Sequence, residues 1–288
     1  MEVSYEKDNA SGTYSRVEFS NKYEPAPVIT DIVGSKTLTG ITPANADDFQ
    51  VKIEAADDVT KAVLANASTV DIPDSVINTT NTFTIADDLQ FTKPGTYVFN
   101  VSEVNAGQTI KGITYDAHTE VVTVVIRDNN GALVVDSITY SNGRVENATF
   151  ANTYASTFTG NPISLTGTKS LTGRDILAGE FWFAIVPQGN APAGRASIVS
   201  ATTDGKIQLL TDVNFAVAGT YEYWFYEYIP TSAVDNKSNG VKYDSTVYKF
   251  IVEVTDNWDG TFEVTSKNFY KTEATRDAQG NAVVANNA

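Results

Sequence analysis

Three residue types that could react with one another recur twice along the chain in the same order: a lysine, then a glutamate, then an asparagine. A primary amine can attack a carboxamide carbon, and a nearby carboxyl group can carry the proton that the leaving ammonia needs. The product of that reaction is an isopeptide bond between the lysine and the asparagine. The first set is Lys36, Glu103 and Asn152, and the second is Lys169, Glu227 and Asn286.

The two sets lie at matching places in an internal repeat. Each lysine opens a Lys-x-Leu-Thr-Gly stretch, and each glutamate closes a stretch that begins Gly-Thr-Tyr. A Gly-x-x-Tyr-Asp stretch then leads into a long strand-like segment, and each asparagine ends an Ala-x-x-Ala-Asn stretch. The spacing between copies drifts, as expected of tandem domains whose loops differ in length while their strands keep register.

The composition and patterning favour an all-β fold. The 288 residues suffice for about two domains, and the apolar residues are rich in the strand formers Val, Ile, Tyr and Phe. No stretch has the length and period of an amphipathic helix, and residues 128–131 and 256–260 have the composition of hairpin turns. We therefore expect tandem immunoglobulin-like β-sandwich domains, each with an internal Lys–Asn isopeptide crosslink.

A third, partial copy of the repeat opens the chain. The stretch from Val17 to Tyr23 reads Val-Glu-Phe-Ser-Asn-Lys-Tyr and matches the segment that ends at Tyr154. Its asparagine, Asn21, has no lysine or glutamate of its own copy in this sequence, so we expect it to be uncrosslinked. The first residues lack the basic and apolar segments of a signal peptide, which fits a cytosolic protein or a piece of a longer one, and the partial copy favours the piece. The expected domains are residues 1–25, the terminal hairpin of a truncated upstream repeat, and two isopeptide-linked repeats at residues 26–155 and 156–288.

Strand parity places the three residue types of each set inside a core. Side chains alternate between the faces of a strand, so Lys36 shares a face with Ile32 and Leu38. The residues at every second position before each glutamate are apolar, so each glutamate shares their face of the strand. Asn152 likewise shares a face with the aromatic residues two positions before and two positions after it. The ordinary interpretation is a buried Lys–Glu ion pair capped by an asparagine. A further alternative is that the lysine points inward on an edge strand and prevents that edge from pairing with another chain. The strand could also have a register other than the one assumed from parity.

The reactive interpretation also follows from burial. An apolar core favours the neutral form of a lysine amine, which is a nucleophile, and the protonated form of a carboxyl group, which can donate to a carboxamide. Amides are poor electrophiles, so fixed geometry must contribute, and it can be worth effective molarities of roughly 10⁵–10⁸ M. Folding supplies that geometry once per molecule, and the chemistry is therefore a single-turnover self-modification.

The stretch from Thr168 to Phe183, the two Gly-Thr-Tyr…Glu stretches and the segment Phe-Ala-Asn-Thr-Tyr ending at Tyr154 carry a family resemblance. Together they resemble the streptococcal pilin isopeptide linkage domain, an immunoglobulin-like module of Gram-positive pilins and surface proteins. The resemblance implies that each first-strand lysine bonds to the last-strand asparagine while the intervening glutamate assists. It assigns Lys36, Asn152 and Glu103 to one crosslink and Lys169, Asn286 and Glu227 to the other.

The function implied by the resemblance is structural. The chain would be a stalk or pilin-type region of a Gram-positive cell-surface protein, extracellular, and either anchored to the cell wall or part of a pilus. Its crosslinks would give mechanical and proteolytic stability, with no enzyme activity beyond the formation of each bond. Expected partners are neighbouring repeats or pilin subunits of the same protein, with a host surface ligand as a further candidate.

Two departures from the family pattern distinguish the copies. After Lys36 the chain lacks the Gly-Arg-x-x-Leu-Ala-Gly-Glu-Phe continuation that follows Lys169. Asn286, in turn, lacks the flanking aromatic residues that surround Asn152. Asn281 and Asn287 are therefore alternative bonding partners in the second copy.

The composition excludes several other classes of function. A formal net charge of −15 without a long basic run argues against nucleic acids and anionic membrane surfaces as partners. No apolar stretch is long enough to insert into a membrane. The absence of cysteine and the single histidine, His118, which we expect in an exposed polar turn, exclude most zinc sites and histidine-based catalysis. We expect neither a metal nor a cofactor.

Two binding functions are the alternatives to a crosslinked stalk. A carbohydrate- or host-ligand-binding adhesin module could use exposed rings such as Trp258, Trp224 and Tyr226. Calcium could bind the acidic turn at residues 256–260, although this turn lacks the fuller ligand set of a calcium loop and ordinary turn chemistry explains it better.

Overall fold

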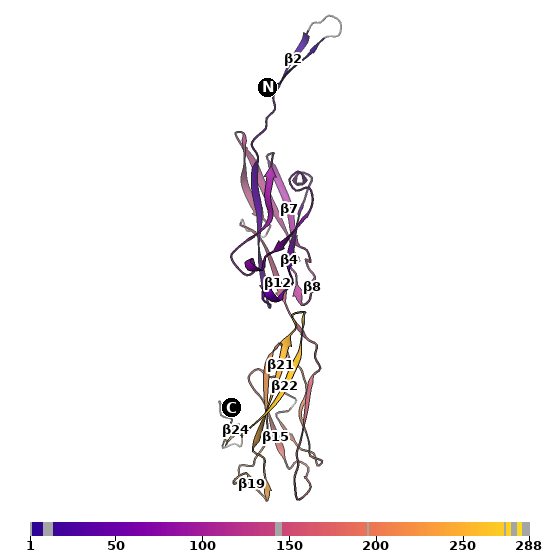
Figure 1. Ribbon diagram of the computed structural model, residues 1–288, viewed down its shortest axis with the longest axis vertical. Helices are drawn as coiled ribbons and strands as arrows, with labels where there is room; N and C mark the ends of the chain where they lie inside the picture. The colour runs from indigo at the N-terminus through magenta and orange to yellow at the C-terminus, as the bar shows by residue number, and fades with distance from the viewer. Residues whose placement is uncertain are drawn as a thin grey trace. The chain divides into compact units, whose positions relative to one another are not determined.

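The computed structural model describes residues 2–7, 14–141, 146–194, 196–273, 275–277 and 281–283. Its regular structure is almost entirely β, which confirms the predicted fold class of tandem β-sandwich domains. Two compact units divide the chain: unit 1 is Met1–Thr109 and Thr114–Thr153, and unit 2 is Ile110–Ile113 and Tyr154–Ala288. In Figure 1 the strands of unit 1 run from indigo to magenta and those of unit 2 from pink to yellow. The helices among the described residues are short 3₁₀ turns, η1 (Pro43–Asn45), η2 (Thr60–Ala62) and η3 (Asp74–Val76).

The first and last strands of unit 1 are neighbours in one sheet. That sheet contains β6, β3 and β12 in this order, and the facing sheet has the order β11-β10-β7-β4-β5. β12 runs parallel to β3 and pairs Phe150 with Lys36, whereas β6 is antiparallel to β3. The strands are β3 (Val28–Thr39), β4 (Phe49–Ala55), β5 (Ser68–Ile72), β6 (Phe83–Phe91), β7 (Gly95–Glu103), β8 (Thr109–Ile110), β9 (Ile113–Thr114), β10 (Thr119–Asn129), β11 (Ala132–Tyr140) and β12 (Ala148–Tyr154).

β3 buries every second residue along its second half, as the sequence pattern predicts. Ile32, Gly34, Lys36 and Leu38 are buried, and the residues between them are more exposed. Gly34 is required by close packing, because a Cβ atom there would lie 2.8 Å from Cδ1 of Ile85. The inward face of β3 is therefore tightly packed on both sides of its one lysine.

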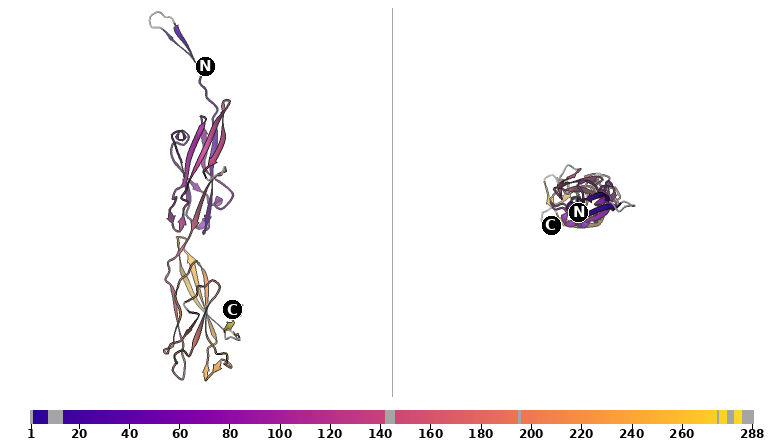
Figure 2. Two further views of the ribbon diagram at one scale, coloured as in Figure 1. Left: turned by 180° about the vertical axis from the view of Figure 1, so that it is seen from behind. Right: turned by 90° about the horizontal axis from the view of Figure 1, so that it is seen from above.

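Unit 2 repeats this design with one large sheet and one small one. The sheet of order β13-β22-β21-β18-β15-β16 packs against the pair β14-β17, and Ile163 and Leu210 of that pair share a core cluster with Tyr223 and Phe250. The view from behind in Figure 2 shows the strands of this unit side by side. The strands are β13 (Thr157–Phe158), β14 (Ile163–Thr168), β15 (Trp182–Pro187), β16 (Ile198–Ser200), β17 (Lys206–Val213), β18 (Gly219–Glu227), β19 (Lys237–Ser238), β20 (Val241–Lys242), β21 (Thr246–Asp256), β22 (Thr261–Glu273), β23 (Thr275–Arg276) and β24 (Ala282–Val283).

Both predicted hairpin turns are present. Asn130 and Gly131 adopt positive φ angles of 54° and 96° between β10 and β11, and Trp258 has a φ of 59° between β21 and β22. In the second turn the Asp256 carboxylate accepts hydrogen bonds from the Trp258 N–H at 2.8 Å and from the Tyr154 hydroxyl at 2.6 Å. Its oxygens thus accept hydrogen bonds at the turn, as expected of an aspartate at the start of a hairpin turn.

The N-terminal segment forms a two-stranded antiparallel hairpin of β1 (Glu2–Lys7) and β2 (Tyr14–Ser20). Phe19 and Tyr23, which lie four positions apart in the sequence, are 67% and 68% exposed. After the hairpin, Ala26 forms an isolated parallel bridge with Ala132 at the start of β11. None of the helices described in the structure is long and apolar enough to span a bilayer.

Candidate functional site

The first set of residues meets in the core of unit 1. Lys36 comes from β3 and Asn152 from the adjacent β12, while Glu103 ends β7 in the facing sheet. The three residues are only 1%, 1% and 2% exposed, respectively. Nζ of Lys36 donates to Oε1 of Glu103 at 2.6 Å, and Nδ2 of Asn152 donates to the same oxygen at 3.2 Å. One carboxyl oxygen therefore lies between the amine and the carboxamide nitrogen.

The surroundings of Lys36 favour its neutral form. Burial lowers the pKa of the Lys36 amine, and the attraction of Glu103 opposes this shift only in part. On another side Nζ lies 4.9 Å from the centre of the Phe49 ring. The amine is therefore held in an apolar core against one acidic partner, which are conditions for a nucleophilic lysine.

A backbone group that the sequence did not reveal completes the site. The N–H of Asp116 donates to Oδ1 of Asn152 at 2.9 Å and to Oε2 of Glu103 at 2.9 Å. This N–H thus points at the oxygen that would become negative if an amine attacked the Asn152 carboxamide, which is the role of an oxyanion hole. The repeated Gly-x-x-Tyr-Asp stretch, in which Asp116 is the last residue, was the signal that could have identified it.

The Asp116 side chain holds that backbone group in place. Its Oδ2 accepts from the N–H of Ala151, next to Asn152, and its Oδ1 accepts from the backbone N–H and Nδ1 of His118 at 3.1 and 2.6 Å. Burial raises the pKa of Asp116, but the hydrogen bonds from His118 and Ala151 outweigh it and lower the pKa overall. The carboxylate is thus ionised and fixed.

His118 is not the freely exposed residue that its polar turn predicted. Its ring stacks on Phe150 with centroids 5.4 Å apart, and its side chain is 38% exposed. Nε2 lies 3.7 Å from the fully buried carboxyl group of Glu120. The difference arises because β12 brings Phe150 beneath the turn, a long-range contact that local sequence does not encode.

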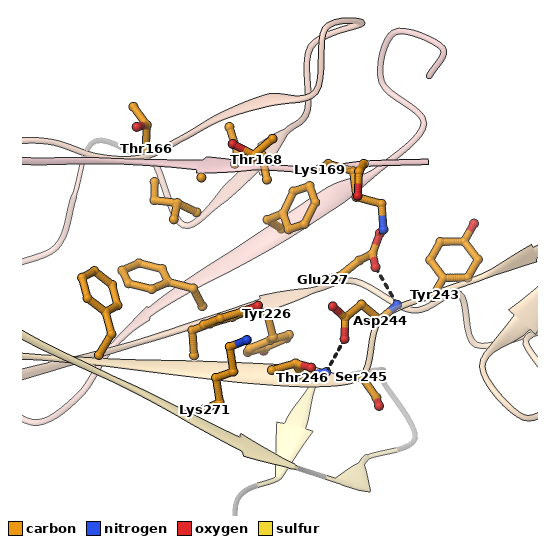
Figure 3. A pocket seen from close by; sticks show the side chains of 18 of the residues that line it. Thr166, Thr168, Lys169, Tyr226, Glu227, Tyr243, Asp244, Ser245, Thr246 and Lys271 are labelled. Atoms are coloured by element: carbon orange, nitrogen blue, oxygen red, sulfur yellow. Dashed lines mark hydrogen bonds and ion pairs between the residues drawn. The ribbon is translucent and has the colours of Figure 1, made fainter. Parts of the chain in front are cut away.

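Unit 2 brings together the lysine and glutamate of the second set. Nζ of Lys169 lies 2.7 Å from Oε1 of Glu227 and 4.5 Å from the centre of the Phe181 ring. The N–H of Asp244 donates to Oε2 of Glu227 at 2.8 Å, as the N–H of Asp116 does in unit 1. Figure 3 shows Lys169 pointing toward Glu227, with Asp244 beside it. Lys169 directly follows β14 rather than lying in it, and its side chain is 11% exposed.

The partner predicted for Lys169 and its two alternatives belong to the C-terminal segment of the sequence. Asn286 and the alternative Asn287 lie outside the described residues. The other alternative, Asn281, is exposed and bonds to the Asp277 side chain through its backbone N–H at 2.8 Å and its Nδ2 at 3.0 Å. The described part of the predicted last strand, Ala282–Val283, pairs with β23.

The rings considered for ligand binding have packing partners. Trp258 is 43% exposed and lies against Tyr154 with ring centroids 6.1 Å apart. Trp224 is half-buried and lies under Nζ of Lys249, 5.8 Å from the ring centre. Neither pair forms a stacked platform of exposed rings for a sugar.

One group of carboxylates has the spacing of metal ligands. Oxygens of Asp31, Asp87 and Asp88 lie within 4.8 Å of one another, and all three residues are exposed. Repulsion by Asp88 and then Asp31 raises the pKa of Asp87. Exposed acidic groups of this kind are common without an ion, and we assign no metal to this one.

The chain is similar to a known protein family and to several solved structures. The family described as FctA, Spy0128-like isopeptide containing domain, matches residues 32–155 and residues 165–283. Among solved structures, the major pilin from Streptococcus pyogenes is 18% identical, with 88% of this chain and 99% of that chain covered and a TM-score of 0.33. The S. pyogenes major pilin proteins T-13 and T3.2 are 17% and 13% identical, cover 86% and 87% of this chain and 95% and 93% of their own, and have TM-scores of 0.31 and 0.32.

No curated protein sequence matches the chain. The family match spans most of its length and includes both lysines, both glutamates and Asn152. The chain therefore belongs to the family of Spy0128-like isopeptide containing domains, of which it carries two copies.

Proposed function

We propose that this chain is a structural stalk or pilin-type region of a Gram-positive surface protein, crosslinked by intramolecular Lys–Asn isopeptide bonds. The observation that supports it best is the contact of Lys36, Glu103 and Asn152 inside the core of a family member. The first bond joins Lys36 to Asn152, and a second joins Lys169 to Asn286. The crosslinked repeats are residues 26–155 and 156–288, and residues 1–25 are the terminal hairpin of an upstream repeat.

In the proposed reaction the amine nitrogen of the lysine replaces the amide nitrogen of the asparagine. Neutral Nζ of Lys36 attacks Cγ of Asn152, the new C–N bond forms, and the bond from Cγ to Nδ2 breaks. Glu103 takes one proton from Nζ and delivers it to Nδ2, so that one ammonia leaves and the glutamate ends as it began. The Asp116 N–H stabilises the negative charge that Oδ1 carries between the two steps.

The geometry explains why an unactivated amide can react. Both the nucleophile and the leaving nitrogen contact the same carboxyl oxygen, at 2.6 and 3.2 Å, so one group can serve both proton transfers. The parallel pairing of β3 with β12 fixes the positions of the two reactants. Lys36 lies opposite Phe150, and Asn152, two residues after Phe150, lies opposite Leu38. This proximity replaces a bimolecular encounter and the activation of the amide.

The proposed setting is the bacterial exterior. The chain contains no cysteine, so the crosslinks supply the covalent reinforcement that extracellular proteins commonly obtain from disulfides. Partners are neighbouring repeats or pilin subunits of the same surface protein, in keeping with the family of isopeptide containing domains to which the chain belongs. Each bond forms once, so the chain is a self-modifying structural protein rather than an enzyme.

Intact mass spectrometry tests the proposal directly. We expect the protein to be lighter than its sequence by one ammonia for each bond, that is, by two. Proteolysis should yield a branched peptide joining Lys36 to Asn152. A mass equal to that of the unmodified sequence would contradict both crosslinks.

A substitution of the residue that positions the oxyanion donor should slow the first bond without abolishing it. In Asp116→Ala the hydrogen bonds to Ala151 and His118 are lost, and the backbone N–H is no longer held against Asn152. We expect bond formation slower by up to about 100-fold, as for small displacements of a reacting group. The measurement is the fraction of freshly refolded molecules that have lost ammonia as a function of time. Asp136→Ala, which removes an exposed carboxylate that bonds to Arg127, is the control and should react at the original rate.

A further inference from the structure

One edge of β3 loses its strand partner just before the first lysine. On that edge β6 runs antiparallel to β3, and their pairing ends with Phe83, the first residue of β6, opposite Gly34. On the other edge β12 accompanies β3 from Gly34 to Thr39. Among the described residues no strand therefore pairs with the β6 edge of β3 beside Lys36 and Leu38.

A single residue of the loop between β5 and β6 takes the place of that strand. Oδ1 of Asn78 accepts from the Leu38 N–H at 2.8 Å, and Nδ2 of Asn78 donates to the Leu38 carbonyl at 2.8 Å. The backbone N–H of Asn78 donates to the Lys36 carbonyl at 2.9 Å. A carboxamide presents an acceptor and a donor side by side, as a peptide group does, so Asn78 pairs with β3 much as another strand would.

The backbone of the loop presents Asn78 to β3 in a particular conformation. Asn78 has a φ of 60°, in the left-handed region that asparagine tolerates better than most residues. The preceding residue, Ile77, is only 4% exposed, and its N–H donates to the Asp74 carbonyl of η3 at 3.2 Å. Asn78 itself is exposed, so its side chain can be removed without opening a cavity in the core.

The two residues that Asn78 contacts on β3 set the geometry of the first site. One is Lys36, the proposed nucleophile, and the other is Leu38, which lies opposite Asn152 in the parallel pairing. Nζ of Lys36 and Nδ2 of Asn152 contact the same oxygen of Glu103, at 2.6 and 3.2 Å. A shift of β3 at these positions would therefore move the amine relative to the carboxamide.

Unit 2 holds its lysine with a turn residue at the same place in the topology. β17 pairs antiparallel with β14, as β6 does with β3, and the turn before β17 contains Gly205 with a φ of 80°. The Lys169 N–H donates to the Gly205 carbonyl at 2.7 Å. Here the strand pairing continues to Thr168, directly before the lysine, whereas in unit 1 it stops two residues short. This difference explains why unit 1 uses a side chain to complete the edge.

We propose that Asn78 is a positioning residue for the first isopeptide bond. Its carboxamide fixes β3 at Leu38 and thereby keeps Nζ of Lys36 within reach of Cγ of Asn152. The inference rests on the proposed function and changes none of its chemistry: the same C–N bond forms, the same ammonia leaves, and Glu103 carries the same proton. Asn78 affects how fast the bond forms and is not needed once the bond exists.

Asn78→Gly tests this role in the full chain. Glycine removes the carboxamide but retains the left-handed backbone and the N–H that bonds to Lys36. We expect the branched peptide joining Lys36 to Asn152 to form about 10- to 100-fold more slowly after refolding, as for a small displacement of a reacting group. The time course is followed without denaturant, where the variant is folded, so a loss of stability alone does not change the rate.

Two further variants separate positioning from other effects. Asn130→Gly is the matched control, because Asn130 also has a left-handed backbone, with a φ of 54°, but lies in the β10–β11 turn, and this variant should react at the original rate. Asn78→Asp keeps an acceptor for the Leu38 N–H and should recover part of the rate. If Asn78→Gly does not fold, Asn78→Asp should still react more slowly than the original chain, since it lacks the donor to the Leu38 carbonyl.

An Asn78→Gly chain that reacts as fast as Asn130→Gly, or an Asn78→Asp chain no faster than Asn78→Gly, would overturn the inference and leave the proposed function standing. Failure of the original chain to lose ammonia at all would instead contradict the proposed function, and the role of Asn78 with it.

Discussion

Lys36→Ala is expected to produce the largest loss of stability in unit 1. The proposed bond closes a loop of 152 − 36 = 116 residues, and a crosslink of that span contributes about 5 kcal/mol by the chain-entropy estimate used for disulfides. The substitution also removes the Nζ group that donates to the fully buried Glu103 carboxyl, and a buried polar group left without its partner typically costs about 1–3 kcal/mol. We expect the melting temperature of unit 1 to fall by roughly 15 °C or more.

Calorimetry should show this shift in one of two transitions, because unit 2 keeps its own core. Asn152→Ala separates the two contributions, since it removes the bond but keeps the Lys36 Nζ donor beside Glu103, and it should lose the crosslink contribution alone. Lys61→Ala, at an exposed lysine that pairs with Asp58, is the control and should change stability by less than about 0.5 kcal/mol. Equal melting temperatures for Asn152→Ala and the original chain would contradict a crosslink in unit 1.

Glu103→Gln is expected to have the largest effect on bond formation itself. Glutamine has nearly the same shape and can still bond to Lys36 and Asn152, but it cannot accept a proton from one nitrogen and return it to the other. Loss of a general acid–base group typically slows a reaction by about 10²–10⁴-fold. Compared with the mass of its own sequence, freshly purified variant should therefore retain one ammonia that the original protein has lost, with lysine, asparagine and the rest of the core in place.

Glu120→Gln is the matched control for that substitution. Glu120 lies on the neighbouring strand β10 and is also fully buried, and its carboxyl group accepts from the Ser141 hydroxyl and lies 3.7 Å from Nε2 of His118. It should lose the first ammonia as completely as the original chain does. Complete ammonia loss in Glu103→Gln would show that another group carries the proton.

Much of the fold was predictable because its signals are local. Alternating strands, turn residues at 128–131 and the internal repeat all depend on neighbouring positions, and the structure contains the expected hairpins. Strand parity also predicts the burial observed for Lys36, since a side chain at every second position faces the same layer. The pairing of β12 with β3 in parallel could not be derived from parity, because register between distant strands is a tertiary property.

The side chains of the candidate site could be predicted from the sequence, but their arrangement in space could not. The Asp116 N–H was missed because every residue except proline has such a group; the repeated Gly-x-x-Tyr-Asp stretch marks its position, and the fold shows where it points. Lys169 was expected in a strand, yet β14 ends one residue before it, where Gly205 accepts the Lys169 N–H. The repeat predicted a last strand beside β14; the structure describes only residues 281–283 of the segment that would carry it, and Ala282–Val283 pair with β23.

The parallel pairing of β3 with β12 also bears on the order of folding. We expect a contact that joins the two ends of a unit to form late, because closing the long intervening loop costs conformational entropy. Until β12 is in place, Asn152 is absent from the site, and Lys36 and Glu103 have nothing to react with. The proposed release of ammonia would therefore be confined to molecules that have completed their native topology, and the mass of each molecule would record whether its folding was ever finished.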